Sequence, residues 1–343
     1  MPDFFVDRII RLESKENLFD MLTEKAKAGG GSIRGIPTTD VKGGNAVNVA
    51  YCLAKLGAKV SLFTVADELG ATMIRQTFSQ FGDKVTLRIA SGRSGLTTSF
   101  EFPYEDTHVN VMVSDIGDNA NFGSERISSE ADRTILKNAD GVMIVNWASN
   151  LKGTELAEFS FKNSPSAFHF ISPADIETRK HDFRDSLAKL ASLTDCLSMN
   201  ENECNSLADA LGFGRPLGPS YSADEVKGVA KRIAERVGIS TDLHTKIGAA
   251  WSNGKESTFA HAIKVEAKRL TGAGDVWDAA GCGPQARDRP APRRRPRARQ
   301  PRSDEPDRAQ HHDQRVRGAR AGVPAAPGRP GKDHPAGRRR GAA

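Results

Sequence analysis

The chain has 343 residues, and its 49 Lys and Arg against 43 Asp and Glu give a formal net charge of +6 at pH 7. This length suits one large α/β domain or two smaller ones. No apolar run reaches the roughly 20 residues that cross a bilayer, and no N-terminal segment resembles a signal peptide. The 4 cysteines form no C-x-x-C pair, which argues against a disulfide framework or a zinc module. We therefore expect a cytoplasmic protein with reduced thiols and no membrane partner.

The first segment, residues 2–12, is apolar enough for a strand that continues into a second, more alternating strand. This segment contains Asp7. Its apolar residues begin at the terminus itself, whereas more residues normally precede a buried first strand. Residues 13–42 are polar and include three consecutive glycines. This composition predicts an exposed excursion before the next core element.

A helix is predicted directly after the paired glycines Gly43 and Gly44. Apolar residues recur at helical spacing from residue 46 to residue 56, and Gly57 is a natural helix stop. Asn45 and Asn48 project near the start of this helix, one turn apart, where their amides could hydrogen-bond a polyhydroxyl ligand. The alternative is that Asn45 caps the helix and Asn48 is solvated, and the residues alone leave both open.

The following segments alternate in the manner of a parallel sheet. Residues 59–65 read as a buried strand and residues 68–81 as a helix, which is the βαβ pattern. Residues 97–114 instead show two alternating runs around a turn, so we predict a β-hairpin and interpret it as a lid. The parallel pattern resumes with a helix at about residues 125–138 and with apolar strands that include 141–145.

Two later turns carry polar groups at strand ends. A strand at residues 196–199 runs into Asn200-Glu201-Asn202-Glu203, where an Asn and a Glu three residues apart can reach a hydrated Mg²⁺ or a phosphate. The alternative is an ordinary helix start with acids in its first turn. Residues 242–251 read as strand, tight turn, strand, with Thr245 and Gly248 placed where a nucleotide phosphate could meet a hydroxyl and a bare backbone.

The stretch from Leu270 to Gly281 holds the strongest single motif. Thr271 is followed by Gly272, Ala273 and Gly274, and then by Asp275 at the start of a run that suits a helix. Glycines let backbone N–H groups approach a ligand, and a helix start presents unpaired N–H groups and a positive dipole end, so the turn can bind an anion. Asp275 could accept a proton from an attacking hydroxyl beside that anion. An ordinary strand-to-helix turn capped by Asp is the alternative.

Taken together, these motifs resemble the ribokinase or PfkB-type carbohydrate kinases. The resemblance covers roughly residues 3–283 and rests on the order of its parts: Asp7, the GGNAVN stretch at 43–48, the NENE stretch at 200–203, Thr245 with Gly248, and the TGAGD stretch at 271–275. It implies a ribokinase-like α/β fold in which helices flank a largely parallel central sheet. It also implies a small β lid built from segments near 8–42 and 97–114.

The resemblance further implies ATP-dependent phosphoryl transfer, assisted by Mg²⁺, to a hydroxyl of a sugar. Asp275 matches the catalytic base, and Gly272, Ala273 and Gly274 match the anion hole. The positions that match acceptor binding are Asp7, Gly43, Gly44, Asn45 and Asn48. Those that match cofactor binding are Asn200, Thr245, Gly248, Thr271, Gly272 and Gly274. Glu203 matches the position that faces Mg²⁺ through water.

The sequence departs from the family pattern at three places. Position 45 is Asn where ribokinases often carry Lys, so ribose is not implied as the substrate, and Trp277 stands where the family usually has Phe. From Pro284 onward the chain loses apolar periodicity: residues 284–343 contain 17 Lys and Arg, 6 Asp and Glu, 10 of the 17 prolines, and no Leu, Ile, Met or aromatic residue. We therefore expect a kinase domain at 1–283 that lacks the C-terminal part of the fold.

The tail at 284–343 has three interpretations: a shifted reading frame, a disordered basic tail that binds RNA or another polyanion, and the mark of a decayed, inactive kinase. The alternatives to a sugar kinase are accordingly a nucleoside kinase of the same family and an inactive protein that binds sugar or nucleic acid. A homodimer formed by lid strands is also open.

Overall fold

We describe the protein from a computed structural model, which covers residues 2–105, 107–263 and 272–287 and omits the side chains of 15–17, 107–108 and 282–287. The chain divides into two units, Met1–Arg293 and Arg294–Ala343, and every described residue belongs to the first. No helix in the described part of that unit has both the length and the apolar character required to span a membrane. Thr271 and the tail beyond residue 287 lie outside the described residues.

The strands are β1 (Phe5–Arg11), β2 (Thr38–Gly43), β3 (Val60–Ala66), β4 (Val85–Ser91), β5 (Gly95–Tyr104), β6 (Thr107–Asp115), β7 (Gly141–Val145), β8 (Phe168–Ser172), β9 (Cys196–Asn200), β10 (Ser240–Thr245), β11 (Gly248–Ser252) and β12 (Ser257–His261). The α-helices are α1 (Lys15–Lys27), α2 (Asn45–Lys55), α3 (Glu68–Phe78), α4 (Glu130–Lys137), α5 (Gly153–Lys162), α6 (Lys180–Leu190), α7 (Glu201–Ala210), α8 (Ala223–Val237) and α9 (Ala273–Arg287). Short 3₁₀ turns occupy Ser79–Lys84, Gly117–Asn121, Ser124–Ile127, Trp147–Ser149 and Glu177–Arg179.

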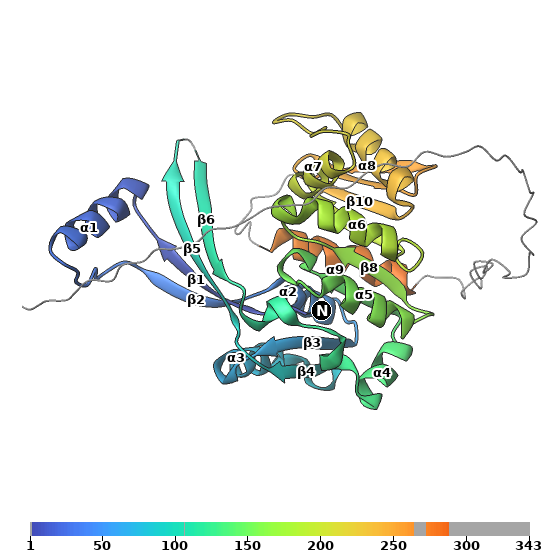
Figure 1. Cartoon of the computed structure of the whole chain (residues 1–343), viewed down its shortest axis with the longest axis horizontal. Coiled ribbons are helices and arrows are strands. Elements are labelled where there is room, and N and C mark those ends of the chain that lie inside the picture. Colours follow the sequence, from blue (N-terminus) through green and yellow to red (C-terminus); the bar gives the residue numbers. More distant parts are fainter. Residues whose placement is uncertain (1, 106, 264–271, 288–343) are drawn as a thin grey trace, which may run out of the picture. The chain divides into compact units, whose positions relative to one another are not determined.

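The largest sheet has six strands in the order β12-β11-β10-β9-β8-β7. Strands β7 to β10 are parallel, as the alternating pattern predicts, while β10, β11 and β12 pair antiparallel. Strand β8 is buried along its whole length, which is typical of a strand covered by helices on both faces. Helices α5, α6, α7 and α8 lie beside these strands (Figure 1). The prediction of an α/β fold with helices around a largely parallel sheet is confirmed.

A second sheet has four strands in the order β2-β1-β5-β6. Strands β5 and β6 form the predicted antiparallel hairpin, and β1 joins it in parallel while it pairs antiparallel with β2. Figure 1 shows these four strands extending away from the six-stranded sheet, with α1 beyond their far end. Residues 13–42 are largely exposed, as expected of an excursion, and they also hold α1 and most of β2, which the composition did not predict.

The third sheet contains only β3 and β4, which run parallel and are connected through α3. Asp67 caps α3 by accepting the backbone N–H of Gly70 at 2.8 Å. The helix ends at Phe78, before the predicted residue 81, because a 3₁₀ turn with Gly82 in a non-helical conformation follows. The helix expected at 125–138 likewise starts later, after Ser129, whose hydroxyl accepts the backbone N–H of Asp132.

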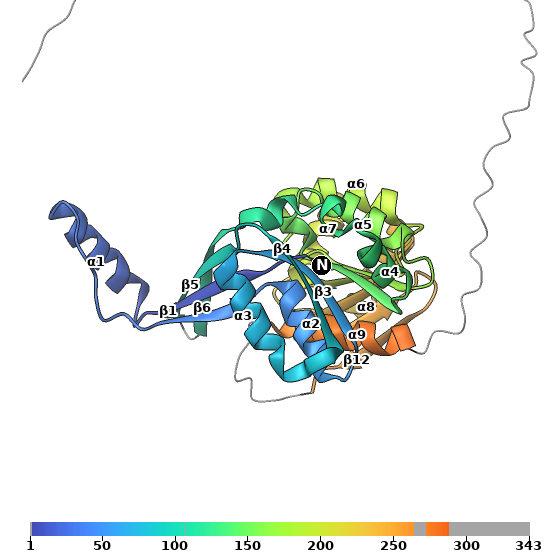
Figure 2. The ribbon, with the colours of Figure 1, turned by 90° about the horizontal axis from the view of Figure 1, so that it is seen from below.

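The apolar core has two main clusters. One fills the space between the six-stranded sheet and its helices, with Trp147, Phe161 and Phe183 among its largest buried side chains. The other joins α2, β3 and α3 and includes Phe4 from the N-terminus and Ala279 from α9. Helices α2 and α9 pack against each other in this second cluster (Figure 2). Their N-terminal ends carry the motifs on which the functional prediction depends.

Candidate active site

The glycine-rich turn lies at the start of a helix, as predicted. Gly272 has a φ of +88°, a conformation that L side chains rarely adopt, and its carbonyl accepts the backbone N–H of Val276 at 3.1 Å. Asp275 occupies the first turn of α9 and is only 6% exposed. Its carboxylate is therefore fixed at the positive end of a helix and shielded from solvent.

Two asparagines from α2 hold the Asp275 carboxylate. Asn45 donates its side-chain amide to Oδ1 of Asp275 at 2.8 Å, and Asn48 donates to Oδ2 at 2.9 Å. Lys42 in turn donates to Oδ1 of Asn48 at 2.7 Å. The alternative in which Asn45 caps α2 is wrong, since the N-cap residue is Gly44, which has no side chain to cap the helix. These hydrogen bonds join Asn45 and Asp275, which are 230 positions apart in the sequence, in one polar cluster.

The environment of Asp275 makes its carboxyl group a weak acid. Burial raises its pKa to about 7, the hydrogen bonds from Asn48 and Asn45 lower it, and the nearby charges of Asp3 and Asp278 raise it further. A carboxyl group with a pKa near neutrality can accept a proton and release it again under ordinary conditions. Asp275 has the protonation behaviour that a general base requires.

Asp3 organises the start of α2. Its carboxylate accepts the backbone N–H groups of Asn45 at 2.8 Å and Ala46 at 2.9 Å, together with the side-chain amide of Asn146 at 2.9 Å. The first N–H groups of a helix have no partner inside the helix, so a buried acceptor there stabilises the helix start. Asp3 is 1% exposed and fixes the backbone from which Asn45 reaches Asp275.

The paired glycines lie in close contact with β1 and with the two residues that precede it. A Cβ atom at Gly43 would collide with the carboxylate of Asp7. Gly44 has a φ of +95°, and a Cβ there would lie 2.8 Å from the carbonyl oxygen of Asp3. The structure therefore brings Asp7, Gly43 and Gly44 next to the residues that hold Asp275. Their predicted role in binding an acceptor stays a prediction.

Polar contacts also anchor the buried side of α9, and the sequence did not reveal them. Ser198 donates to Asp278 at 2.6 Å, and the indole N–H of Trp277 donates to Asp242 at 3.0 Å. Burial raises the pKa of both carboxyl groups to about 6. A Phe at position 277 would lack the donor for Asp242, so the departure from the family pattern has a local structural reason.

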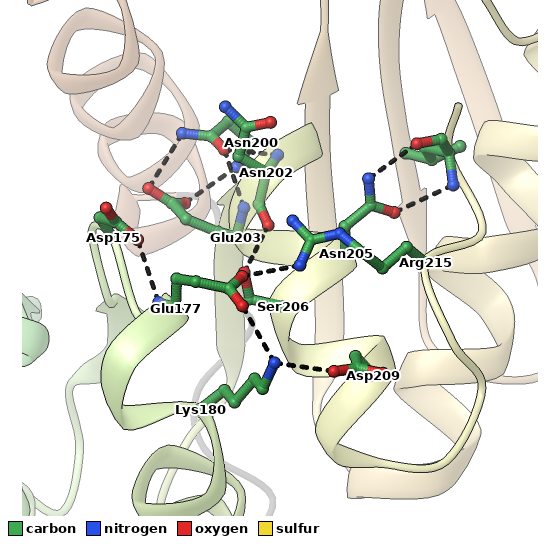
Figure 3. A network of polar contacts seen from close by, with 11 residues as sticks. Asp175, Glu177, Lys180, Asn200, Asn202, Glu203, Asn205, Ser206, Asp209 and Arg215 are labelled. Atoms are coloured by element: carbon green, nitrogen blue, oxygen red, sulfur yellow. Dashed lines mark hydrogen bonds and ion pairs between the residues drawn. The ribbon is translucent and has the colours of Figure 1, made fainter. Parts of the chain in front are cut away.

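The stretch at 200–203 forms the N-terminus of α7 and closes a capping box (Figure 3). Asn200 accepts the backbone N–H of Glu203 at 3.0 Å, while the Glu203 carboxylate accepts the backbone N–H of Asn200 at 3.0 Å and its side-chain amide at 2.9 Å. The alternative of a helix start with acids in its first turn is therefore confirmed, and the structure adds the capping box. A role for Asn200 or Glu203 toward a cofactor stays a prediction.

Glu203 lies in a region of negative potential. Its pKa is raised to about 8, chiefly by burial, and the charges of Asp278, Asp175 and Asp275 add to the rise. Within the described ranges, no group of three or more His, Cys, Asp or Glu could bind a metal ion directly. Mg²⁺ usually keeps several of its waters. A cation beside Glu203 would therefore keep most of its waters, with at most one or two carboxylates as protein ligands.

A second polar network supports α7 from the other side (Figure 3). Glu177 accepts hydrogen bonds from Ser206 at 2.6 Å, Arg215 at 2.8 Å and Lys180 at 2.9 Å. These donors lower the pKa of Glu177 to about 2. The network ties the middle of α7 to Glu177 and to Lys180 at the start of α6.

Asn200→Ala is expected to reduce stability by about 1 kcal/mol, as for other lost N-caps, and to raise the Mg²⁺ concentration that gives half-maximal rate, because Glu203 loses its partners. Ser222→Ala is the matched control, since Ser222 and Glu225 form the same capping box on α8. Urea unfolding and a Mg²⁺ titration of activity check both variants. Equal Mg²⁺ dependence in the two variants would leave Asn200 a purely structural role.

Thr245 and Gly248 face each other across the tight turn between β10 and β11. The Thr245 hydroxyl donates to the carbonyl of Gly248 at 2.7 Å. Gly248 has a φ of +149°, and a Cβ there would collide with the carbonyl of Ala260 on β12. Packing thus explains why position 248 is glycine. A contact of either residue with a nucleotide stays a prediction, as does that of Thr271, which lies outside the described residues.

His244 is a further residue that the sequence did not single out. It precedes the β10–β11 turn, its ring centroid lies 5.8 Å from that of Trp277, and a Cβ atom at Gly274 would lie 3.5 Å from its Nε2. Burial lowers its pKa to about 4, so the imidazole is neutral near pH 7. The turn at Gly274 therefore lies beside this neutral ring, at a distance that would still leave a Cβ atom in ordinary van der Waals contact.

Comparison with known proteins identifies the family to which this chain belongs. The chain matches the family of pfkB carbohydrate kinases over residues 13–280 and is a member of that family. Similar solved structures include an adenosine kinase from Sinorhizobium meliloti, with a TM-score of 0.62, 16% identity and coverage of 83% of this chain and 85% of the other.

Two ribokinases have the same fold. The enzyme from Thermotoga maritima has a TM-score of 0.60 and 20% identity over 83% of this chain and 84% of its own. The enzyme from Arabidopsis thaliana, solved with ribose and ATP, has a TM-score of 0.60 and 17% identity over 84% of this chain and 85% of its own. No curated protein matches the chain. At these identities the structural likeness confirms the ribokinase-like fold, and the site has to be argued from the residues.

Proposed function

We propose that the protein transfers the γ-phosphoryl group of ATP to a hydroxyl of a sugar, with Asp275 as the general base. The observation that carries this proposal is the carboxylate of Asp275, buried at the start of α9, held by Asn45 and Asn48, and given a pKa of about 7. Membership of the pfkB carbohydrate kinases supports the reaction class. A nucleoside is the second candidate acceptor, since an adenosine kinase shares the fold.

Phosphoryl transfer chiefly requires alignment of the acceptor and neutralisation of charge on the transferred oxygens. In the proposed mechanism, Asp7, Gly43 and Gly44 with the two asparagines define where the acceptor hydroxyl lies. Asp275 takes the proton of that hydroxyl as the bond to the γ-phosphorus forms, while the bond from this phosphorus to the β–γ bridging oxygen breaks and ADP leaves. The backbone N–H groups of Gly272, Ala273 and Gly274 then face the developing negative charge.

Asn200, Thr245, Gly248 and Thr271 are the residues that we propose to contact ATP, and Glu203 is proposed to hold hydrated Mg²⁺. The cation supplies positive charge against the phosphate oxygens when it is bound. The carboxylates around Glu203 favour a cation by their summed charge, which also raises the pKa of Glu203. We further propose that residues 1–283 are the kinase domain and that segments 8–42 and 97–114, which form the four-stranded sheet, cover the acceptor.

The experiment that tests this function measures ADP release in the presence of ATP and Mg²⁺, first without an acceptor and then with ribose or adenosine. A kinase is expected to release ADP only when an acceptor is present, and the faster acceptor assigns the class. Release that is equal with and without acceptors would mark an ATPase. A folded protein that binds a sugar but releases no ADP would support the inactive alternative.

The pH dependence follows from the carboxyl group of Asp275. Because the base must be ionised, and because burial raises its pKa to about 7, kcat/KM is expected to fall about tenfold for each pH unit below that value and to level off above it. Initial rates from pH 5 to pH 9 at saturating ATP check this. A profile that stays level down to about pH 4, the ordinary range for Asp, would contradict the assignment.

A further inference from the structure

Lys42 lies beside the candidate active site, and the proposed mechanism gives it no role. It belongs to β2, where it pairs with Val6 of β1, and the next residue, Gly43, packs against Asp7. Because side chains alternate along a strand, Lys42 projects from the face of the sheet opposite to that of Asp7. Its Nζ atom reaches α2 and donates to Oδ1 of Asn48 at 2.7 Å. The ammonium group therefore approaches the site from the side away from Asp7.

The side-chain amide of Asn48 has an ionic group at each end. Its oxygen accepts from the ammonium group of Lys42, and its nitrogen donates to Oδ2 of Asp275 at 2.9 Å. A reversed amide would turn its NH₂ group toward the ammonium and its oxygen toward the carboxylate, so both hydrogen bonds would be lost. Hydrogen bonds to ionised groups are also the stronger kind. Lys42 therefore fixes Asn48 as a donor to Asp275.

Tyr51 helps to hold the ammonium group of Lys42. The Nζ atom lies 4.9 Å from the centre of the Tyr51 ring, a distance at which the face of the ring attracts a cation. The ring packs edge-on against Phe78 and Phe81, with centroid distances of 6.2 Å and 5.3 Å. Aromatic packing between α2 and the end of α3 therefore positions this cation from outside the cluster that surrounds Asp275.

The bond that Lys42 orients has a large influence on Asp275. Burial raises the pKa of this carboxyl group most, the hydrogen bond from Asn48 lowers it, and the charges of Asp3 and Asp278 raise it further. Among the causes that lower this pKa, the bond from Asn48 is larger than the bond from Asn45. A change in the donor strength of Asn48 therefore alters the ionisation of Asp275 directly.

The ionisable groups around Asp275 are mostly acids. Burial raises the pKa of the nearby Cys52 thiol, the charge of Lys42 lowers it, and the charge of Asp275 raises it, so both charges act on the same region. Lys42 adds positive charge where the carboxylates otherwise disfavour ionisation. By element, the ionisable groups of this region are Asp3 ahead of β1, Lys42 on β2, Cys52 and Lys55 on α2, Glu203 on α7, the neutral His244 on β10 and Asp278 on α9.

We propose that Lys42 is a positioning residue for the phosphoryl transfer: its ammonium group orients the amide of Asn48 and keeps the Asp275 carboxylate ionised and able to accept a proton. This inference rests on the proposed function, in which Asp275 is the general base. Lys42 acts through Asn48 and not on the acceptor, because it projects from the face opposite to Asp7.

The first test is the pH profile of kcat/KM. Because an opposite charge close to an Asp carboxyl lowers its pKa by about one unit or more, Lys42→Met is expected to move the midpoint of the profile upward by about one pH unit. The rate should then fall about tenfold at pH 6 and stay within about twofold of the wild-type rate at pH 9. Lys42→Arg keeps a cation and a donor, so it should restore most of the midpoint.

Lys55→Met is the matched control. The Nζ atom of Lys55 lies 5.3 Å from the centre of the same Tyr51 ring, and its charge also lowers the pKa of the Cys52 thiol. This variant removes a similar cation from the same ring but leaves the bond between Lys42 and Asn48 intact. Its profile should keep the wild-type midpoint.

The second test needs no turnover. In protein labelled with ¹³C at the Asp carboxyl groups, an NMR titration follows the ionisation of Asp275, whose signal is identified by its absence from Asp275→Asn. The midpoint of this signal is expected to rise by about one pH unit in Lys42→Met and to stay in place in Lys55→Met.

A carboxyl midpoint that stays in place in Lys42→Met would overturn the inference. An equal rise in Lys55→Met would overturn it as well, as a general effect of charge, and so would a loss of rate that is the same at every pH. If the carboxyl midpoint rises but the rate profile does not move, Asp275 is not the base, and the proposed function fails together with the role of Lys42. In a protein without turnover, the NMR titration alone decides whether Lys42 controls the ionisation of Asp275.

Discussion

Asp275→Asn is expected to lower kcat by roughly 10²- to 10⁴-fold, the usual contribution of a positioned general base. The amide has the shape of the carboxylate and can still accept from Asn45 or Asn48, but it cannot take a proton from an acceptor hydroxyl. Steady-state rates at pH 8 measure the loss. A variant that retains most of the wild-type kcat would remove Asp275 from the role of base.

The stability of the same variant provides its own check. The folded-state pKa of Asp275 is raised to about 7, so ionisation of this carboxyl group lowers the free energy of unfolding of the protein. The stabilising effect of the protonated carboxyl group is complete below about pH 4 and is lost as pH rises through 7. The Asn variant lacks this ionisation, so its Tm relative to the wild type should increase between pH 5 and pH 8. Asp132→Asn is the control for activity, since Asp132 is buried on α4 beside Arg88 and should affect stability only.

Asp3→Ala is expected to destabilise the protein by about 2–4 kcal/mol, because it leaves buried donors at the start of α2 without an acceptor. For a domain of this size the change corresponds to a fall in Tm of roughly 5–15 °C. Since Asn45 would lose its fixed backbone, kcat should also fall by about 10- to 100-fold. Thermal unfolding and kinetics at a temperature where the variant is still folded measure the two effects separately.

Asp67→Ala is the matched control for Asp3. Asp67 also caps a helix, α3, but it accepts only the backbone N–H of Gly70, so the expected loss is about 1 kcal/mol with unchanged kcat. Asp3→Asn tests the chemistry further, because its amide N–H₂ would face a donor from Asn45 or Ala46. If Asp3→Ala and Asp67→Ala have equal effects on stability and on kcat, Asp3 has no special role in the site.

The motifs that sequence reasoning identified correctly have local signals. The helix after Gly43 and Gly44, the hairpin at β5 and β6, and the helix start at Asp275 are each encoded by periodicity or by turn residues within a short window. Their order along the chain led to the ribokinase-like fold, which the family match confirms. Boundaries were less accurate where a 3₁₀ turn flanks a helix, as at Ser79–Lys84.

The residues that sequence reasoning missed act over long separations. Asp3 caps a helix that starts 42 residues later, and Ser198 pairs with Asp278 across 80 residues. No spacing rule connects such partners, because the fold alone brings them together. Helix α1 was also missed, although Leu18, Met21 and Leu22 recur in it at helical spacing. The polar composition of residues 13–42 outweighed this short signal, and the helix is largely exposed.

The asparagines show how a structure refines a role. From sequence, Asn45 and Asn48 are either acceptor-binding groups or parts of a helix start. In the folded protein both amides donate to Asp275, so they orient the carboxylate whether or not they also contact an acceptor. We therefore regard the cluster of Asp3, Asn45, Asn48 and Asp275 as one unit, in which helices α2 and α9 position the carboxylate that we propose as the proton acceptor.

The measurement that tests the central claim most directly is transfer of the labelled γ-phosphoryl group of ATP, followed by mass spectrometry of the acceptor. The account predicts that the label moves from ATP to a hydroxyl of a sugar or nucleoside, that it does so only with an acceptor present, and that Asp275→Asn abolishes most of this transfer. A folded protein that binds ATP and acceptor but leaves the label on ATP, or that passes it only to water, would contradict the account.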